Sequence, residues 1–292
     1  MRSLRNVLAG SALALTTLLI AGCESALFSF ANRGLAPPEA SVTYAPELKL
    51  ELDIYRPQHG DTRSAPTVVF FYGGGWQRGS RQQYQFIGRR LAQSGILTIV
   101  ADYRTYPQAV FPDFIDDAAR AVAWSRAHAG QYGGDPDRLF VAGHSAGAQI
   151  AALLATDPRY LKRHGLQPSA LAGMIGLSGP YDFVINGQYT KVFGPPAQWP
   201  QAQAINFVDG DEPPFLLIHG ADDRVVHAKD SIDIAAKLKA EGVAATLLIL
   251  PDAGHSAPLL GLYDPPRSPM VLPAIERFIR ESGGAKATPR AR

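Results

Sequence analysis

The sequence predicts an α/β fold: a doubly wound, mostly parallel sheet with helices on both faces and a small cap insertion. Two observations lead to this prediction. Short apolar runs recur along the chain without alternating with polar residues, which is typical of strands that are buried on both faces. Longer segments with an apolar stripe at helical spacing lie between these runs, and a succession of this kind gives a parallel sheet.

The predicted strands are rich in β-branched and aromatic residues, and several of them end at glycines. An earlier run over residues 48–55 alternates apolar and polar residues, so we expect an antiparallel edge strand there. The buried strands are expected over residues 67–72, 96–101, 139–142, 171–177, 215–219 and 246–250. The clearest helical stripes cover residues 114–128, 148–155 and 231–240.

The first 22 residues resemble an export signal, with Arg2 and Arg5 ahead of an apolar run that is short for a membrane span. The run ends in Leu-Ile-Ala-Gly-Cys23, which resembles the lipobox of bacterial lipoproteins. We therefore expect a lipid anchor at Cys23 and a place in the bacterial cell envelope, with the outer membrane or periplasmic face favoured. The alternative is an ordinary signal peptide with a chance cysteine.

Charge and cysteine content exclude several classes of function. Cys23 is the only cysteine, so the chain forms no internal disulfide. The 28 Lys and Arg stand against 26 Asp and Glu, and removal of the signal with its two arginines leaves a formally neutral chain. No basic stripe points to nucleic acid, and no histidine pair has a metal-ligand spacing, so we expect neither nucleic acid, metal nor cofactor.

The predicted organisation is a single domain with flexible ends. We expect residues 23–40 to form a tether, 41–281 to form the domain and 282–292 to form a flexible tail. Residues 178–213 contain several glycines and prolines and follow no regular pattern. A long irregular insertion is often functional, so we expect a cap near the site, with a plain surface excursion as the alternative.

The strongest functional signal is Gly143-His-Ser145-Ala-Gly147, which follows a predicted strand and precedes a predicted helix. This strand–turn–helix context is typical of a nucleophile elbow, whose tight turn leaves no room for side chains beside the serine. A serine hydroxyl needs a neighbouring base to attack a carbonyl. The pattern therefore predicts Ser145 as a nucleophile, against the alternative of a serine that caps the helix.

A base and an acid follow the next strands in the order that the elbow requires. His255 follows the strand at 246–250, and Asp223 follows the strand at 215–219. Both would lie at the carboxyl end of the sheet, where ligands bind in open α/β folds. Asp222 is a weaker alternative to Asp223 and is more typical of a turn. Of the other histidines, we expect His144 to point away from the attacked carbonyl and the rest to be structural or solvated.

The glycines at 73–75 follow the strand at 67–72 and allow backbone N–H groups to approach a substrate. Together with the N–H of Ala146, they would form the donors of an oxyanion hole. The alternative is a simple flexible turn.

These motifs together resemble the α/β-hydrolase branch that contains hormone-sensitive-lipase-like esterases, BD-FAE-like proteins and kynurenine formamidases. The resemblance covers about residues 44–280. It also rests on Asp102-Tyr103-Arg104, Phe111-Pro112, Asp116-Asp117 and the segment 133–138. It implies that the second and third glycines, Gly74 and Gly75, are the donors. This chain has Tyr72 where the family usually has histidine.

The favoured function is hydrolysis of a small carboxylic ester, with short-chain or aryl esters implied by the resemblance. The reaction would pass through an acyl-enzyme on Ser145, without a cofactor. Amide or formamide hydrolysis by the same residues is an alternative. A non-catalytic lipoprotein that uses the fold as a binding scaffold is another. The sequence leaves the oligomeric state open.

Overall fold

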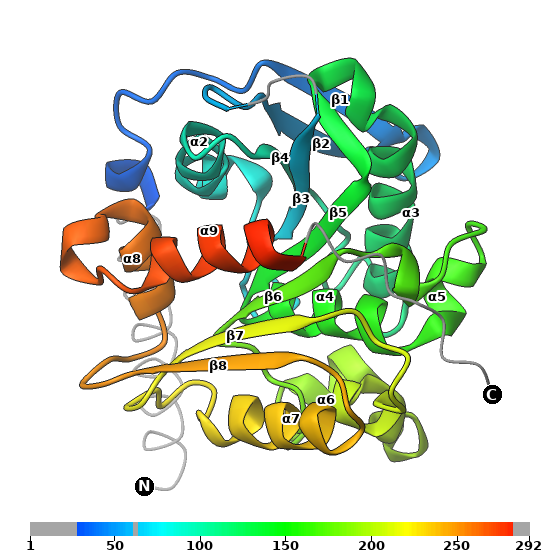
Figure 1. Ribbon diagram of the computed structural model, residues 1–292. Coiled ribbons are helices and arrows are strands. Elements are labelled where there is room, and N and C mark those ends of the chain that lie inside the picture. Colours follow the sequence, from blue (N-terminus) through cyan, green and yellow to red (C-terminus); the bar gives the residue numbers. More distant parts are fainter. Residues whose placement is uncertain (1–27, 61–63, 283–292) are drawn as a thin grey trace, which may run out of the picture.

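The computed structural model describes residues 28–60 and 64–282, and it contains an eight-stranded sheet (Figure 1). The strand order is β1-β2-β4-β3-β5-β6-β7-β8. The strands from β3 to β8 pair in parallel, whereas β2 pairs antiparallel with both β1 and β4. The predicted mostly parallel sheet is confirmed. The strands are β1 (Ala40–Ala45), β2 (Leu50–Tyr55), β3 (Ala65–Phe71), β4 (Leu97–Ala101), β5 (Gly134–His144), β6 (Gly173–Leu177), β7 (Phe215–Gly220) and β8 (Ala245–Leu250).

The run at 48–55 is antiparallel as expected, but its expected place at the edge of the sheet is wrong. This run forms β2, which lies between β1 and β4, and β1 is the edge strand. Val42 of β1 stands opposite Leu52. Because β1 is only half buried along most of its length, it carries too weak an apolar pattern to be recognised from the sequence alone.

The order of the strands places a topological switch point between β3 and β5. The chain passes from β3 to β4 on one side, and β5 then pairs with β3 on the other side. Loops that leave two such strands at their carboxyl ends diverge and open a crevice. The glycine loop follows β3 and Ser145 follows β5, so the switch point brings these two predicted parts of the site together.

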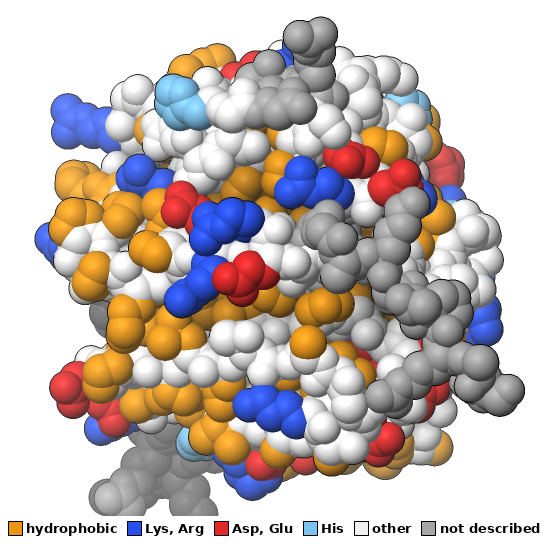
Figure 2. Space-filling model, viewed as in Figure 1, with side chains coloured by type: hydrophobic (Ala, Val, Ile, Leu, Met, Phe, Trp, Pro, Cys, Tyr) orange, Lys and Arg blue, Asp and Glu red, His pale blue; other side chains and the backbone are white. Residues whose placement is uncertain are grey.

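Helices cover both faces of the sheet, as predicted (Figure 1). One face carries α2, α8 and α9, and the other carries α3, α4 and α7. On the face shown in Figure 2, hydrophobic side chains gather over α8 and in the band between α9 and α7, where β7 and β8 run. The helices are α2 (Gln85–Gln93), α3 (Asp113–His128), α4 (Ala146–Thr156), α5 (Pro158–Lys162), α6 (Tyr189–Phe193), α7 (Lys229–Ala240), α8 (Ala257–Tyr263) and α9 (Val271–Ser282).

The stretch expected to be a free tether, residues 23–40, is bound to the domain wherever the structure describes it. The side-chain amide of Asn32 donates to the carbonyls of Gln82 and Gln83, and its oxygen accepts the N–H of Phe86. Arg89 of α2 donates to the carbonyl of Ala36. Long-range contacts between side chains and backbone therefore hold this segment against α2 and the turn before it. Cys23, the export signal and residues 283–292 lie outside the described residues.

The insertion at 178–213 is folded, although its sequence showed no regular pattern. It contains α6 and two 3-10 helices, Pro196–Ala202 and Ala204–Phe207. Gln203 ties the insertion together, because its side chain both accepts from the N–H and donates to the carbonyl of Phe183. Short helices interrupted by proline have no long apolar stripe, which explains why the sequence concealed them.

Candidate active site

Ser145 occupies a strained turn between β5 and α4. Its backbone dihedrals are φ 53° and ψ −122°, a region that residues with a side chain seldom adopt. A Cβ atom at Gly143 would lie 2.2 Å from the carbonyl oxygen of Gly147, and one at Gly147 would lie 2.1 Å from that of Phe71. Both glycines are therefore required by close packing, as the sequence predicted. An observed strain of this kind is typical of functional sites.

Asp223 and His255 come together at the carboxyl ends of β7 and β8. Nδ1 of His255 lies 2.7 Å from Oδ2 of Asp223. The Asp223 side chain is fully buried, whereas 17% of the His255 side chain is exposed. Asp222, the alternative acid, is exposed, and its side chain forms no hydrogen bond or ion pair with His255. The structure therefore pairs the predicted acid with the predicted base.

His219 is a member of this group that the sequence analysis missed. Its Nε2 lies 3.1 Å from Oδ2 of Asp223 and 3.0 Å from the carbonyl of Val226, and its Nδ1 lies 2.7 Å from Oγ of Ser231. An imidazole that donates from Nε2 and accepts the Ser231 hydroxyl at Nδ1 satisfies all three contacts without a positive charge. In the sequence, only the four-residue spacing from His219 to Asp223 could have predicted this contact.

Asp223 is held as a carboxylate by its hydrogen bonds. Burial alone would raise the pKa of Asp223, but hydrogen bonds from His219 and His255 outweigh burial and lower it. The N–H groups of Val225 and Val226 also donate to Oδ1, at 2.8 and 3.0 Å. An ionised Asp223 fixes the proton of His255 on Nδ1 and leaves Nε2 as the basic nitrogen.

The glycine loop turns sharply beside Ser145. Gly74, Gly75 and Trp76 have φ values of 133°, 61° and 59°. Within the described residues, no acceptor is present for the N–H groups of Gly74 and Gly75, and both residues line the same pocket as Ser145. Ala146 begins α4, where the first N–H groups have no partner inside the helix. The predicted oxyanion donors are thus available for a ligand.

Trp76 fastens this loop to the elbow helix and to the insertion. Its indole Nε1 donates to Oε1 of Gln149 on α4, at 3.1 Å. The amide nitrogen of Gln149 donates in turn to the carbonyl of Ala202, within the insertion. The indole also stacks on Phe183 at 5.4 Å and meets Phe193 edge-on at 4.8 Å. The elbow, the glycine loop and the insertion therefore form one packed unit.

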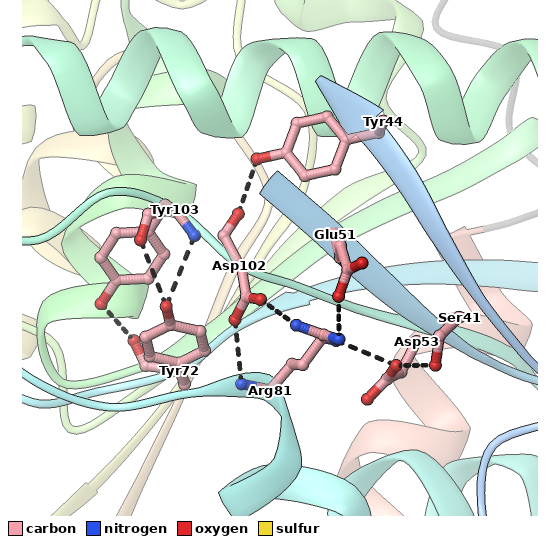
Figure 3. Close-up of polar contacts among 8 residues, drawn as sticks. All are labelled: Ser41, Tyr44, Glu51, Asp53, Tyr72, Arg81, Asp102 and Tyr103. Carbon is pink, nitrogen blue, oxygen red and sulfur yellow. Dashed lines mark hydrogen bonds and ion pairs between the residues drawn. The ribbon is translucent and has the colours of Figure 1, made fainter. Parts of the chain in front are cut away.

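Tyr72, which replaces the usual histidine, braces the start of the loop through Tyr103 (Figure 3). Their rings stack with centroids 4.5 Å apart. The hydroxyl of Tyr103 donates to the carbonyl of Tyr72 at 2.8 Å, and the hydroxyl of Tyr72 donates to the carbonyl of Tyr103 at 3.2 Å. Two reciprocal hydrogen bonds thus hold the strand end without a histidine.

A partly buried cluster of ion pairs around Arg81 supports this pair (Figure 3). Arg81 forms ion pairs with Glu51, Asp53 and Asp102, and its contact with Asp53 is 3.0 Å. Because Asp102 directly precedes Tyr103, the ion pair with Arg81 also fixes the position of the Tyr103 ring that stacks on Tyr72. Burial tends to lower the pKa of Arg81, but Asp102 and Asp53 outweigh burial and raise it, so Arg81 stays charged. The ion pairs of Asp102 and Arg81 therefore support the position of Tyr103.

His144 lines the pocket and connects two parts of the site. The hydroxyl of Tyr84 accepts the N–H of Gly73 at 3.1 Å and lies 3.2 Å from Nδ1 of His144. Nε2 of His144 lies 3.3 Å from the carbonyl of His255. Burial, followed by the charge of His255, lowers the pKa of His144 to about 3, so this ring is neutral and donates from Nε2.

Ser145, Asp223 and His255 line one pocket of about 1650 Å³, together with Gly74 and Gly75. Its wall also includes side chains of the docked N-terminal segment, the insertion, the start of α7 and α8. Several of its lining side chains are exposed hydrophobics: Phe30, Val184, Val225 and Leu260. The pocket exceeds the usual size for a drug-like ligand, so it can hold a substrate with parts on both sides of the serine.

The described residues contain no hydrogen bond between Ser145 and His255. Contacts of this kind often tighten only when a substrate binds. Residues 28–60 and 64–282 also contain no cluster of three or more His, Cys, Asp or Glu that could hold a metal ion. The arrangement provides a nucleophile, a base with its acid and backbone donors.

Comparison with known proteins identifies the family. The model of the BD-FAE family matches residues 52–238, which is more than half of the chain. The chain belongs to the BD-FAE family. The match runs from β2 to α7 and so includes the glycine loop, the elbow and Asp223, whereas His255 lies beyond it. The resemblance that the sequence motifs suggested is confirmed.

Curated relatives of this BD-FAE chain include several proteins named as esterases. It is 31% identical over 269 residues to esterase LipC of Mycobacterium tuberculosis, and 29% identical over 252 residues to a probable isoprenylcysteine alpha-carbonyl methylesterase of Arabidopsis thaliana. The alignments cover 84% and 78% of this chain, and 66% and 52% of those proteins. The chain therefore spans about half to two thirds of the length of these relatives.

Solved structures show the same α/β-hydrolase fold. Esterase 2 of Thermogutta terrifontis, in the form phosphorylated by paraoxon, matches this BD-FAE chain with a TM-score of 0.72 at 24% identity. The match covers 86% of this chain and 96% of that chain. A propionate-bound form of the same esterase matches with a TM-score of 0.71 at 23% identity.

Proposed function

We propose that this protein hydrolyses carboxylic esters, with Ser145 as the nucleophile and His255 and Asp223 as its partners. The observation that carries the proposal is the strained Ser145, which shares a pocket with a His255 bonded to a buried carboxylate at 2.7 Å. Esterase names among the curated relatives support the same reaction class. No cofactor is required.

In the first half of the reaction, Oγ of Ser145 attacks the ester carbonyl and gives its proton to Nε2 of His255. The N–H groups of Gly74, Gly75 and Ala146 stabilise the negative oxygen of the tetrahedral intermediate. The intermediate then expels the alcohol, which takes the proton from His255, and the acyl group remains on Ser145.

In the second half, a water molecule attacks the acyl carbonyl and gives a proton to His255. Collapse of the second intermediate releases the acid, and Oγ of Ser145 recovers its proton. Asp223 stays ionised throughout and stabilises the imidazolium of His255, in keeping with its lowered pKa.

Short acyl chains or aryl groups are the proposed substrates. Esterase 2 of Thermogutta terrifontis has been captured with bound propionate and butyrate, which supports short chains here. A direct test is hydrolysis of p-nitrophenyl acetate and butyrate by the full chain and by Ser145→Ala. The matched control is Ser256→Ala, which removes a hydroxyl from another residue of the same pocket.

We expect Ser145→Ala to lose on the order of a thousandfold or more in kcat, and Ser256→Ala to keep most of its activity. Paraoxon should also label Ser145 in the wild-type protein, since esterase 2 is phosphorylated by this reagent. Equal activity in wild type and Ser145→Ala would refute the proposed nucleophile. Hydrolysis of a matching anilide in preference to the ester would instead favour the amide hydrolase.

We further propose that Cys23 carries a lipid anchor that holds the protein in the cell envelope. The sequence that ends in Leu-Ile-Ala-Gly-Cys23 supports this proposal. Five residue steps from Cys23 to Phe28 reach at most about 18 Å. Because Phe28 and Phe30 line the pocket, the anchor would hold the active site close to the lipid surface. Replacement of Cys23 by serine should abolish palmitate labelling and release the protein from membranes.

A further inference from the structure

The proposed mechanism leaves one buried acid of the pocket without a role. Asp230 lies in the first turn of α7, lines the pocket that contains Ser145 and is only 7% exposed. Among the described residues, its carboxylate has no hydrogen-bond or ion-pair partner. A buried carboxylate without a partner is costly, so its retention in a pocket wall calls for a ligand that compensates it.

The surroundings of Asp230 exclude an ordinary structural role. A carboxylate at the start of a helix usually accepts free N–H groups, but the N–H of Asp230 donates to the carbonyl of His227 and its side chain accepts none. The adjacent cation, Lys229, pairs instead with Asp233 and extends into solvent. Among the charged groups around Asp230, the like charge of Asp182, another residue of the pocket wall, has the largest effect on its pKa and raises it, whereas His219 and Lys229 oppose that effect.

Asp230 has a fixed position relative to the proposed catalytic group. The next residue, Ser231, contacts Nδ1 of His219 at 2.7 Å, and Nε2 of His219 contacts Asp223 at 3.1 Å. The carboxylate thus belongs to the Asp223 side of the pocket. Aromatic side chains of Phe183 and Tyr189 line the same cavity, and their faces are suited to a cation.

We infer that Asp230, assisted by Asp182, binds a protonated amine on the substrate, so that the preferred esters are cationic. This inference rests on the proposed ester hydrolysis and adds the charge of the preferred ester. An ammonium group would supply both the charge and the hydrogen-bond donor that the buried carboxylate lacks. A neutral substrate of the same shape would leave Asp230 unpaired.

The test compares esters that differ only in charge. Dimethylaminopropyl acetate and isohexyl acetate have the same shape, with the amine on the alcohol side, and methyl dimethylaminobutanoate and methyl isoheptanoate place it on the acyl side. Each ester is titrated calorimetrically into the full chain carrying Ser145→Ala, so that binding is measured without turnover. We expect the cationic member of at least one pair to bind about tenfold or more tightly than its neutral isostere.

Asp230→Asn, made in the Ser145→Ala protein, should reduce this preference to about one. The matched control is Asp233→Asn, which removes the same charge from the same helix but not from the pocket wall. It should retain the preference. Asp182→Asn provides a second variant, because its exposed side chain can change without loss of folding, and it should weaken the preference a few-fold.

Equal binding of both members of both pairs would overturn the inference, as would a preference that survives Asp230→Asn. Failure of the proposed function gives a different result, because the wild-type protein would then hydrolyse none of the four esters. The calorimetric comparison still decides the role of Asp230 in that case, since it does not depend on hydrolysis.

Discussion

The buried carboxylate of Asp230 should make the stability of the protein depend on pH in a direction unusual for an acid. Burial and the negative charge of Asp182 raise the pKa of Asp230 from 3.8 to about 7. In the unfolded chain, Asp230 loses its proton near the ordinary value. The folded protein therefore binds more protons between these two pH values, and its stability falls as the pH rises through this window.

The magnitude follows from the size of the pKa shift. A shift of about three units corresponds to about 4 kcal/mol in total, which is fully lost only above the folded pKa. About 1 to 3 kcal/mol of this loss falls between about pH 5 and pH 8. Asp230→Asn removes the titrating group and keeps the shape of the side chain. The variant should therefore gain about 1 to 3 kcal/mol relative to wild type over the same pH interval.

Urea unfolding of the wild-type and Asp230→Asn proteins, followed by tryptophan fluorescence at both pH values, measures this difference. Other titrating groups cancel in the comparison because both proteins contain them. Asp233→Asn serves as the control, because it removes an acid from the same helix that does not line the pocket. A difference between wild type and Asp230→Asn that changes by less than about 0.5 kcal/mol across the interval would refute the reasoning.

Three further changes test the supports of the site. Tyr84→Phe removes the acceptor of the Gly73 N–H. We therefore expect the free energy of unfolding, measured in urea, to fall by about 1 to 3 kcal/mol and kcat to fall several-fold. His219→Phe removes one hydrogen-bond donor to the buried Asp223, so kcat/KM for p-nitrophenyl acetate should fall about tenfold. Unchanged kinetics would contradict the idea that His219 supports Asp223. Gly147→Ala should prevent folding, because its Cβ would lie 2.1 Å from a carbonyl oxygen, whereas Gly130→Ala meets open space and should express normally.

The parts of the fold that the sequence predicted are those determined by local patterns. Strands β3, β4, β6 and β7 and the second half of β5 are buried and rich in apolar residues, and the elbow carries two glycines that its packing requires. The expectation that β8 is buried was wrong, because β8 is an edge strand and its side chains are mostly half exposed. By contrast, β1 was missed because its side chains are mostly half exposed, so that little of its pattern distinguishes it from a linker. The docked segment at 28–39 was missed for a similar reason, because its contacts with α2 come from far along the chain.

The supporting residues of the site were harder to predict than the residues proposed for catalysis. Ser145, Asp223 and His255 follow motifs of fixed spacing. The contact from His144 to the carbonyl of His255 joins residues 111 positions apart, and that from Trp76 to Gln149 joins residues 73 apart. No periodicity encodes such contacts. The unpartnered Asp230 is equally invisible in the sequence, because burial and the lack of a partner are properties of the folded chain.

The replacement of the usual histidine by Tyr72 shows how the glycine loop can keep its geometry with a different residue. The backbone of Tyr72 is held by the hydroxyl of Tyr103, and the next N–H is held by Tyr84. Beyond the glycines, the carbonyl of Trp76 accepts the N–H of Tyr106 at 2.8 Å. Because the loop is fixed on both sides of Gly74 and Gly75, their N–H groups need little reorganisation when charge develops on a substrate oxygen. Preorganised donors of this kind are the main source of oxyanion stabilisation, so Tyr72 is compatible with the oxyanion hole of the proposed mechanism.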